Sequence, residues 1–232
     1  MGPVLATINQ QFMTGCNLGQ QGMATEMAGN LPAAVQLYDQ SLAWIQQSMV
    51  TAQQSGVFVP DNVLFAFSYT HFSAARAKNL LGWAPMAWTH LNSALAALNQ
   101  AIAINPSVVQ YHVAAGTLLM TMGNMPEAER AFMTALQLSP NEPYSQYMLA
   151  FLHSASGNTA AANQYYAAAQ QTAPNLPQMP AMPQPGIAPG MQGAPATAQG
   201  RTDWMNTVNN VCSSLNNVFK TVGNFQDMMK QF

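Results

Sequence analysis

One short pattern recurs along the chain at a spacing that few folds accommodate. It reads "GNMPEAERAFMTAL" from Gly123 and "GNTAAANQYYAAAQ" from Gly157, so that the two copies begin 34 residues apart. A related version, "GNLPAAVQLYDQSL", begins at Gly29. Self-similarity with a period of roughly 20 to 50 residues is typical of stacked units, each of which buries its apolar face on its neighbours. The chain is therefore expected to be an array of small helical units.

The two clear copies place residues of the same kind at the same positions. The stretch that begins at Val109 has Gly116, Ala128, Phe132, Ala135 and Pro140. The stretch that begins at Pro143 has Ala150, Ala162, Tyr166, Ala169 and Pro174. This pattern resembles the tetratricopeptide repeat, a family in which small residues let two antiparallel helices pack closely, an aromatic fills the gap and a proline ends the second helix.

The resemblance implies an all-α fold, a short superhelical solenoid of antiparallel helical hairpins. It extends in part to the first unit, where the second helix is expected to continue to about Gln54. Between these units the sequence predicts two long helices, over roughly 61–81 and 85–104, joined by the turn "LGWAP". Gly123 and Asn124 are expected to tolerate the left-handed backbone that ends one helix, and each Gly-Asn pair is expected to be the turn of a hairpin. Pro126 then suits the first turn of the next helix.

Three segments of different character follow one another. Residues 1–175 are expected to form the repeat domain. Residues 176–200 are rich in Pro, Met, Gln and Gly and carry no charge, which is typical of a flexible linker. Residues 201–232 are expected to form one amphipathic helix that begins after Thr202 or Asp203.

The C-terminal segment carries an apolar stripe with alternating spacings of four and three residues, a heptad pattern. Its members are Trp204, Val208, Val211, Leu215, Val218, Val222, Phe225, Met229 and Phe232. Such a stripe needs an apolar surface to cover it. The sequence leaves open docking on the chain's own repeats or a neighbour's, self-association as a coiled coil, and a separate partner. Membrane binding is disfavoured because Arg201, Lys220 and Lys230 are few.

The composition of the chain indicates which kinds of partner it can bind. Charged residues make up 6% of the chain, against about 25% in typical proteins, and the net charge is -2. The chain has no cluster of Lys and Arg, which argues against nucleic acid. Low charge also weakens protection against self-association. Because the N-terminus has no basic n-region and no apolar run reaches about 18 residues, a cytoplasmic soluble protein is expected.

Nothing in the sequence predicts catalysis, a cofactor or a metal. The four histidines, including His112 and His153 at packing positions of the repeats, show no ligand spacing. Cys16 and Cys212 are expected to be free thiols. Glu127 and Glu129 suit the dipole at a helix start. The chain is therefore predicted not to be an enzyme.

The resemblance also implies a binding surface, because the first helices of successive tetratricopeptide repeats line a concave groove. The corresponding residues are Gln110, Val113, Thr117, Met120, Tyr144, Tyr147, Phe151 and Ser154. This uncharged lining suits an amphipathic helix or an extended apolar peptide. The predicted function is non-catalytic protein binding as an adaptor, scaffold or chaperone-like holder, with the chain's own C-terminal helix as one candidate ligand. The alternative is a structural protein whose C-terminal helix drives homo-oligomerisation.

Overall fold

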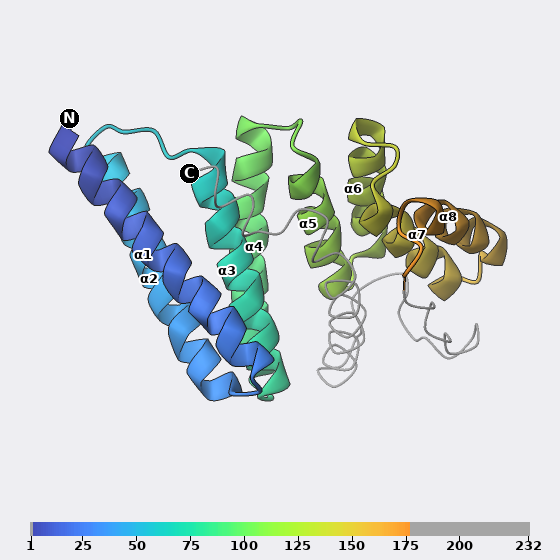
Figure 1. Cartoon of the computed structure of the whole chain (residues 1–232), viewed down its shortest axis with the longest axis horizontal. Helices are drawn as coiled ribbons and strands as arrows, with labels where there is room; N and C mark the ends of the chain where they lie inside the picture. Colours follow the sequence, from blue (N-terminus) through green and yellow to red (C-terminus); the bar gives the residue numbers. More distant parts are fainter. Residues whose placement is uncertain (1, 177–232) are drawn as a thin grey trace. The chain divides into compact units, whose positions relative to one another are not determined.

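The computed structural model describes residues 2–176, and this part of the chain is entirely helical (Figure 1). Its eight helices are α1 (Gly2–Met27), α2 (Leu31–Gln54), α3 (Asp61–Leu80), α4 (Ala84–Ile104), α5 (Val109–Thr121), α6 (Met125–Leu138), α7 (Pro143–Ala155) and α8 (Thr159–Thr172). The predicted all-α class of antiparallel hairpins is confirmed for these residues. The helix ends predicted near residues 54, 61, 81, 85 and 104 agree with the structure within one residue.

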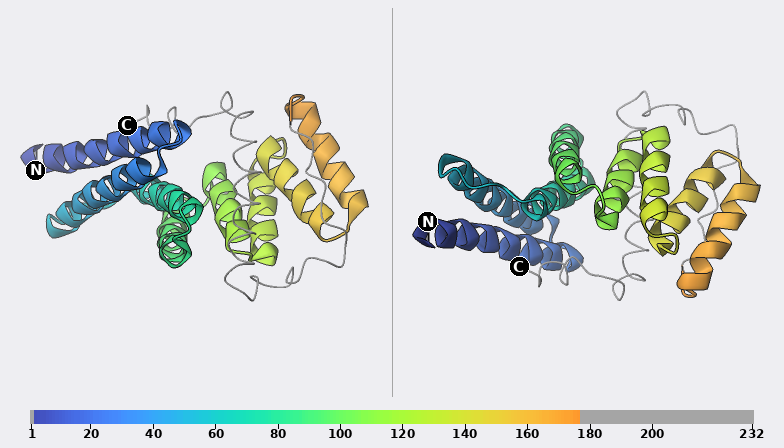
Figure 2. Two further views of the ribbon diagram at one scale, coloured as in Figure 1. Left: turned by 90° about the horizontal axis from the view of Figure 1, so that it is seen from below. Right: turned by 90° about the horizontal axis from the view of Figure 1, so that it is seen from above.

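The chain divides into two compact units, residues 1–111 and the part that begins at His112. In the first unit, α1 pairs with α2 and α3 pairs with α4, while α2 also packs on α3. Figure 2 shows α1 and α2 as a long antiparallel pair. In the second unit, α7 packs on both α6 and α8.

Close approach of α1 to α2 depends on glycines of α1. A Cβ atom added at Gly15 would lie 2.6 Å from Ile45 Cγ1, and one added at Gly22 would lie 2.8 Å from the Tyr38 ring. The Ser41 hydroxyl donates a 2.7 Å hydrogen bond to the Gly15 carbonyl, which is possible only at this short separation. Helix packing of this kind is therefore set by residue size rather than by apolar area alone.

The second unit shows why the repeat pattern has small residues and an aromatic at fixed places. Ala128, Ala135, Ala162 and Ala169 are all buried where neighbouring helices meet. The fully buried ring of Phe132 fills the space beside Gly116, where an added Cβ would lie 2.6 Å from the ring. Gly116 and Phe132, two of the residues that carry the repeat pattern, therefore form a close contact between α5 and α6.

The two residues of each Gly-Asn turn have different structural roles. Gly29, Gly123 and Gly157 adopt φ angles of 84°, 79° and 81°, and within residues 2–176 no residue other than glycine has a positive φ. The expectation that asparagine shares the left-handed backbone is therefore wrong. Asn124 is the N-cap of α6, where its side chain accepts a hydrogen bond from the Glu127 backbone N–H. Asn30 and Asn158 cap α2 and α8 in the same way.

The predicted linker, beyond its first residue Leu176, and the predicted C-terminal helix lie outside the described residues. The same is true of all nine residues of the apolar stripe from Trp204 to Phe232.

Candidate protein-binding site

The eight residues predicted to line a groove lie on two helices of the array. Gln110, Val113, Thr117 and Met120 are spaced three or four apart on α5, and Tyr144, Tyr147, Phe151 and Ser154 are spaced likewise on α7. This spacing places each set of four on one face of its helix. None of the eight carries a formal charge, so the row offers shape and apolar contact rather than ion pairs.

Exposure differs along this row. Gln110 is exposed, and Val113, Tyr144 and Ser154 are half-buried. Met120, Tyr147 and Phe151 are at most 1% exposed and belong to an apolar cluster with Phe132, Met148, Leu149 and Leu152. Thr117 is also buried, with 8% exposed. A partner would contact the first four directly and would reach the four buried side chains only if the packing around them opened.

Tyr147 is held in place by packing against α8. Its ring meets that of Tyr166 on α8 edge to face, with centroids 5.9 Å apart. Burial raises the pKa of Tyr147 to about 12, with a smaller contribution from Tyr166, so its phenol stays protonated at neutral pH. Between α5 and α7, the Thr117 hydroxyl donates a 3.3 Å hydrogen bond to the Tyr144 oxygen.

Burial of α7 extends around the whole helix. Every residue from Ser145 to Leu152 is buried, including the polar Ser145 and Gln146. Eight consecutive residues cover more than two turns, so no face of α7 is open over this length. The side of α7 that carries Tyr147 and Phe151 is therefore covered in the structure.

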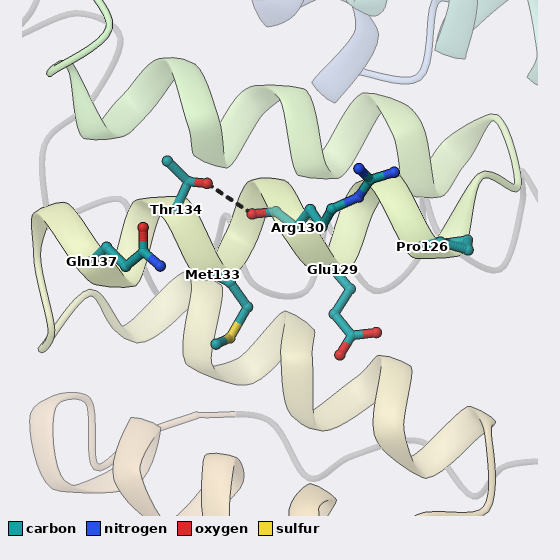
Figure 3. A pocket seen from close by; sticks show the side chains of 6 residues that line it. All are labelled: Pro126, Glu129, Arg130, Met133, Thr134 and Gln137. Atoms are coloured by element: carbon teal, nitrogen blue, oxygen red, sulfur yellow. Dashed lines mark hydrogen bonds between the residues drawn. The ribbon is translucent and has the colours of Figure 1, made fainter.

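A separate open depression of about 500 Å³ lies over α6 (Figure 3). Its lining comes from this helix alone, namely Pro126, Glu129, Arg130, Met133, Thr134 and Gln137. The Thr134 hydroxyl donates to the Arg130 carbonyl one turn earlier, as is usual for a helical threonine. The lining has one carboxylate and one guanidinium and no nucleophile paired with a base, so this surface lacks the parts of a catalytic site.

His153 is used in packing beside this depression, as its repeat position predicts. Its ring stacks on that of Tyr165 with centroids 5.4 Å apart and an interplanar angle of 8°. Its Nε2 lies 3.7 Å from Glu129 Oε1. The Tyr165 hydroxyl in turn contacts the Met133 sulfur at 3.3 Å. These contacts join α6, α7 and α8 at the surface.

The first unit holds two polar clusters that the sequence did not predict. In one, Arg76 donates two hydrogen bonds to the Glu26 carboxylate, at 2.9 and 2.8 Å, and Tyr38 donates a third at 2.6 Å. In the other, His71, His90, Lys78 and Asp39 form a chain of short contacts. Their only sequence signal is that they are charged or polar residues in mostly uncharged helices.

Cys16 has the environment of a packing residue. It is buried in α1, and burial raises the pKa of its thiol to about 12. Very little thiolate forms at neutral pH under these conditions, and the thiolate is the reactive species. Across residues 2–176, no three His, Cys, Asp or Glu side chains are grouped so as to hold a metal ion. Within the same residues, no helix has the length and apolar character needed to cross a membrane.

Comparison with known families identifies one of these hairpins. A family model described as Tetratricopeptide repeat matches residues 109–142, which comprise α5, α6 and the turn that follows them. The hairpin of α5 and α6 is therefore similar to a tetratricopeptide repeat. The repeat supports a role in protein–protein interaction or scaffolding and indicates an interaction module rather than an enzyme fold. It does not specify what is bound.

Solved structures with similar helices are crystal structures of MamA at 16% sequence identity. One covers 72% of this chain and 95% of its own length, with a TM-score of 0.45. Two others cover 65% and 68% of this chain and 93% and 91% of their own, with TM-scores of 0.38 and 0.37. No curated protein sequence matches the chain.

Proposed function

We propose that the chain is a non-catalytic protein-binding module in which α5 and α7 hold an apolar or amphipathic helix along the row from Gln110 to Ser154. The observation that carries the proposal is the uncharged row of side chains that runs through the tetratricopeptide repeat and onto the next hairpin. Aromatic and methionine side chains adapt well to the apolar face of a bound helix.

The proposed occupant is the chain's own segment 201–232. Its heptad stripe is the longest apolar stripe in the sequence outside the repeat domain, and it follows a proline- and glycine-rich segment. A tether of this length gives a local concentration of about 1 mM, so modest intrinsic affinity would suffice for docking within one molecule. Val113, Tyr144 and Ser154, which are half-buried, are the part of the row that this segment would cover. A foreign helix would then bind by competing with this segment.

The test compares two variants of the full chain. Val211→Asp with Leu215→Asp puts two charges on the stripe, and we expect faster amide exchange in α5 and α7 because their cover is lost. The matched control, Asn209→Asp with Ser213→Asp, adds the same charge on the opposite side of a helix and should leave exchange unchanged. Hydrogen exchange followed by mass spectrometry measures both.

Molar mass by light scattering separates this proposal from self-assembly. Docking within one molecule predicts a monomer for the wild type and for both variants. If the wild type is oligomeric and only the stripe variant is monomeric, the segment is an assembly device and the structural alternative replaces the proposal. If the stripe variant changes neither mass nor exchange, residues 201–232 are not the occupant.

A further inference from the structure

A chain of short polar contacts joins α2, α3 and α4 in the first unit. Lys78 Nζ lies 2.8 Å from Asp39 Oδ1 and 2.7 Å from His90 Nε2. The other nitrogen of that ring, His90 Nδ1, lies 2.8 Å from His71 Nδ1. Lys78 is buried, with 7% of its side chain exposed, whereas both imidazoles are half-buried.

The charge of Lys78 sets the direction of each hydrogen bond in this chain of contacts. Lys78 pairs with a carboxylate and is therefore an ammonium, which donates and cannot accept. His90 Nε2 must then carry a lone pair, and the proton of the neutral ring lies on Nδ1. That proton is donated to His71 Nδ1, which must also be unprotonated. Both rings are accordingly neutral, His90 as the Nδ1–H tautomer and His71 as the Nε2–H tautomer.

Among residues 2–176, no carboxylate forms an ion pair with either imidazole that could offset an added proton. Asp39 is the one acidic residue of α2, and it is already paired with Lys78. His90 is the only titratable residue of α4. On α3, Arg76 is paired with Glu26 of α1, and the Asp61 carboxylate accepts a hydrogen bond from Tyr111, so none of these groups pairs with the imidazoles. His71 also meets the ring of Phe67 edge to face, with the ring centroids 4.5 Å apart.

We propose that Lys78, His90 and His71 form a proton-sensitive latch that holds α3 and α4 together while both imidazoles are neutral. A proton on His90 Nε2 removes the acceptor for Lys78 and places two cations 2.7 Å apart. A proton on His71 Nδ1 removes the acceptor for His90. Either event breaks the chain of contacts and loosens the hairpin of α3 and α4.

The direction of the pH effect on stability follows from the pKa shifts of the two imidazoles. Burial, His90 and Lys78 lower the pKa of His71 to about 4, and burial and Lys78 lower that of His90 against the opposing effect of Asp39. The unfolded chain therefore binds more protons than the folded chain below about pH 6.5, the ordinary value for histidine. The stabilisation is complete above that pH and is lost as the pH falls toward 4.

The test begins with the unmodified full chain. Nitrogen-15 NMR of the imidazoles at pH 7.5 should show the Nδ1–H tautomer for His90 and the Nε2–H tautomer for His71. Between about pH 6.5 and 4, the folding equilibrium constant from urea unfolding should fall by up to about tenfold per pH unit for each ring. Protection factors in α3 and α4 should fall over the same range.

His90→Gln keeps an acceptor for Lys78 but cannot take up a proton. We therefore expect the pH dependence of the protection factors in α3 and α4 to lose the contribution of one imidazole. His153→Gln, on α7 in the other unit, is the matched control and should leave that dependence intact. An Nε2–H tautomer of His90 at neutral pH would overturn the proposal. So would protection factors in α3 and α4 that stay constant down to pH 4.

Discussion

Glycine at a helix contact determines how closely two helices of this chain approach. At Gly116 the space for a side chain is taken by three atoms of the Phe132 ring, at 2.6 to 2.7 Å from an added Cβ. Phe132 is itself fully buried, so its ring has little room to move. Gly116 and Phe132, the eighth and twenty-fourth residues of the stretch that begins at Val109, therefore form one packing unit, in which the absence of one side chain makes room for the other.

We expect Gly116→Val to lower the free energy of unfolding by about 2 to 3 kcal/mol, because the new side chain overpacks the contact with Phe132. Urea unfolding followed by circular dichroism measures this loss. Gly2→Val is the control, because nothing lies within 4 Å of its added Cβ, and it should change stability by less than about 0.5 kcal/mol. Equal effects of the two substitutions would contradict this account of the contact.

At the level of helices, the first unit is held together by apolar packing and by buried polar links between helices. The ion pair of Arg76 and Glu26 joins α3 to α1, and its side chains are only 15% and 10% exposed. Tyr38 adds a bond from α2 to the same carboxylate. The ion pair of Arg130 and Glu127 lies within α6 and is exposed to solvent, with 71% and 45% of the side chains accessible.

Removal of one partner should therefore have very different effects in the two pairs. Arg76→Met leaves the Glu26 carboxylate buried without its cation, and we expect a loss of about 3 kcal/mol in the free energy of unfolding. Arg130→Met should cost less than about 1 kcal/mol, because exposed pairs contribute little. Thermal and urea unfolding of both variants test this. A similar cost for both would show that the Glu26 pair is solvated in solution.

At the level of the whole molecule, each unit has an apolar cluster of its own. Ala34, Val35, Tyr38 and Leu42 form one in the first unit with Ala74 and Ala77. Phe132, Met148 and Phe151 belong to one in the second. In repeat proteins, stability is approximately a sum of local terms and nearest-neighbour terms, so a defect in one cluster has its largest effect nearby.

A substitution in one apolar cluster should consequently increase amide hydrogen exchange mainly in the unit that contains it. Leu42→Ala should lower stability by about 2 to 5 kcal/mol and raise amide exchange most in α1 to α4. Phe132→Ala should lower stability by about 3 to 5 kcal/mol and raise exchange most in α6 to α8. Hydrogen exchange measures both patterns. Uniform acceleration along residues 2–176 would instead indicate that the two units unfold as one.

Helix boundaries and hairpin pairing could be predicted from the sequence because their signals are local. The end of α3, the start of α4 and the Gly-Asn turns depend on glycine, proline and asparagine within a few residues. The same holds for the small residues and the aromatic of the repeat, since their spacing directly encodes the contact of Gly116 with Phe132. The separate roles of Gly123 and Asn124 in one turn were the local detail that the pattern did not resolve.

The sequence by itself determined the helical array and the row of uncharged residues on α5 and α7, because helical periodicity places such residues on one face. Only the tertiary structure decided that Tyr147 and Phe151 are buried while Val113 and Tyr144 are partly accessible, since burial depends on what packs around α7. It also decided the polar clusters, because Glu26 meets Arg76 across 50 residues and Asp39 meets Lys78 across 39. Contacts at such separations leave no periodic trace in the sequence and arise only when the helices pack.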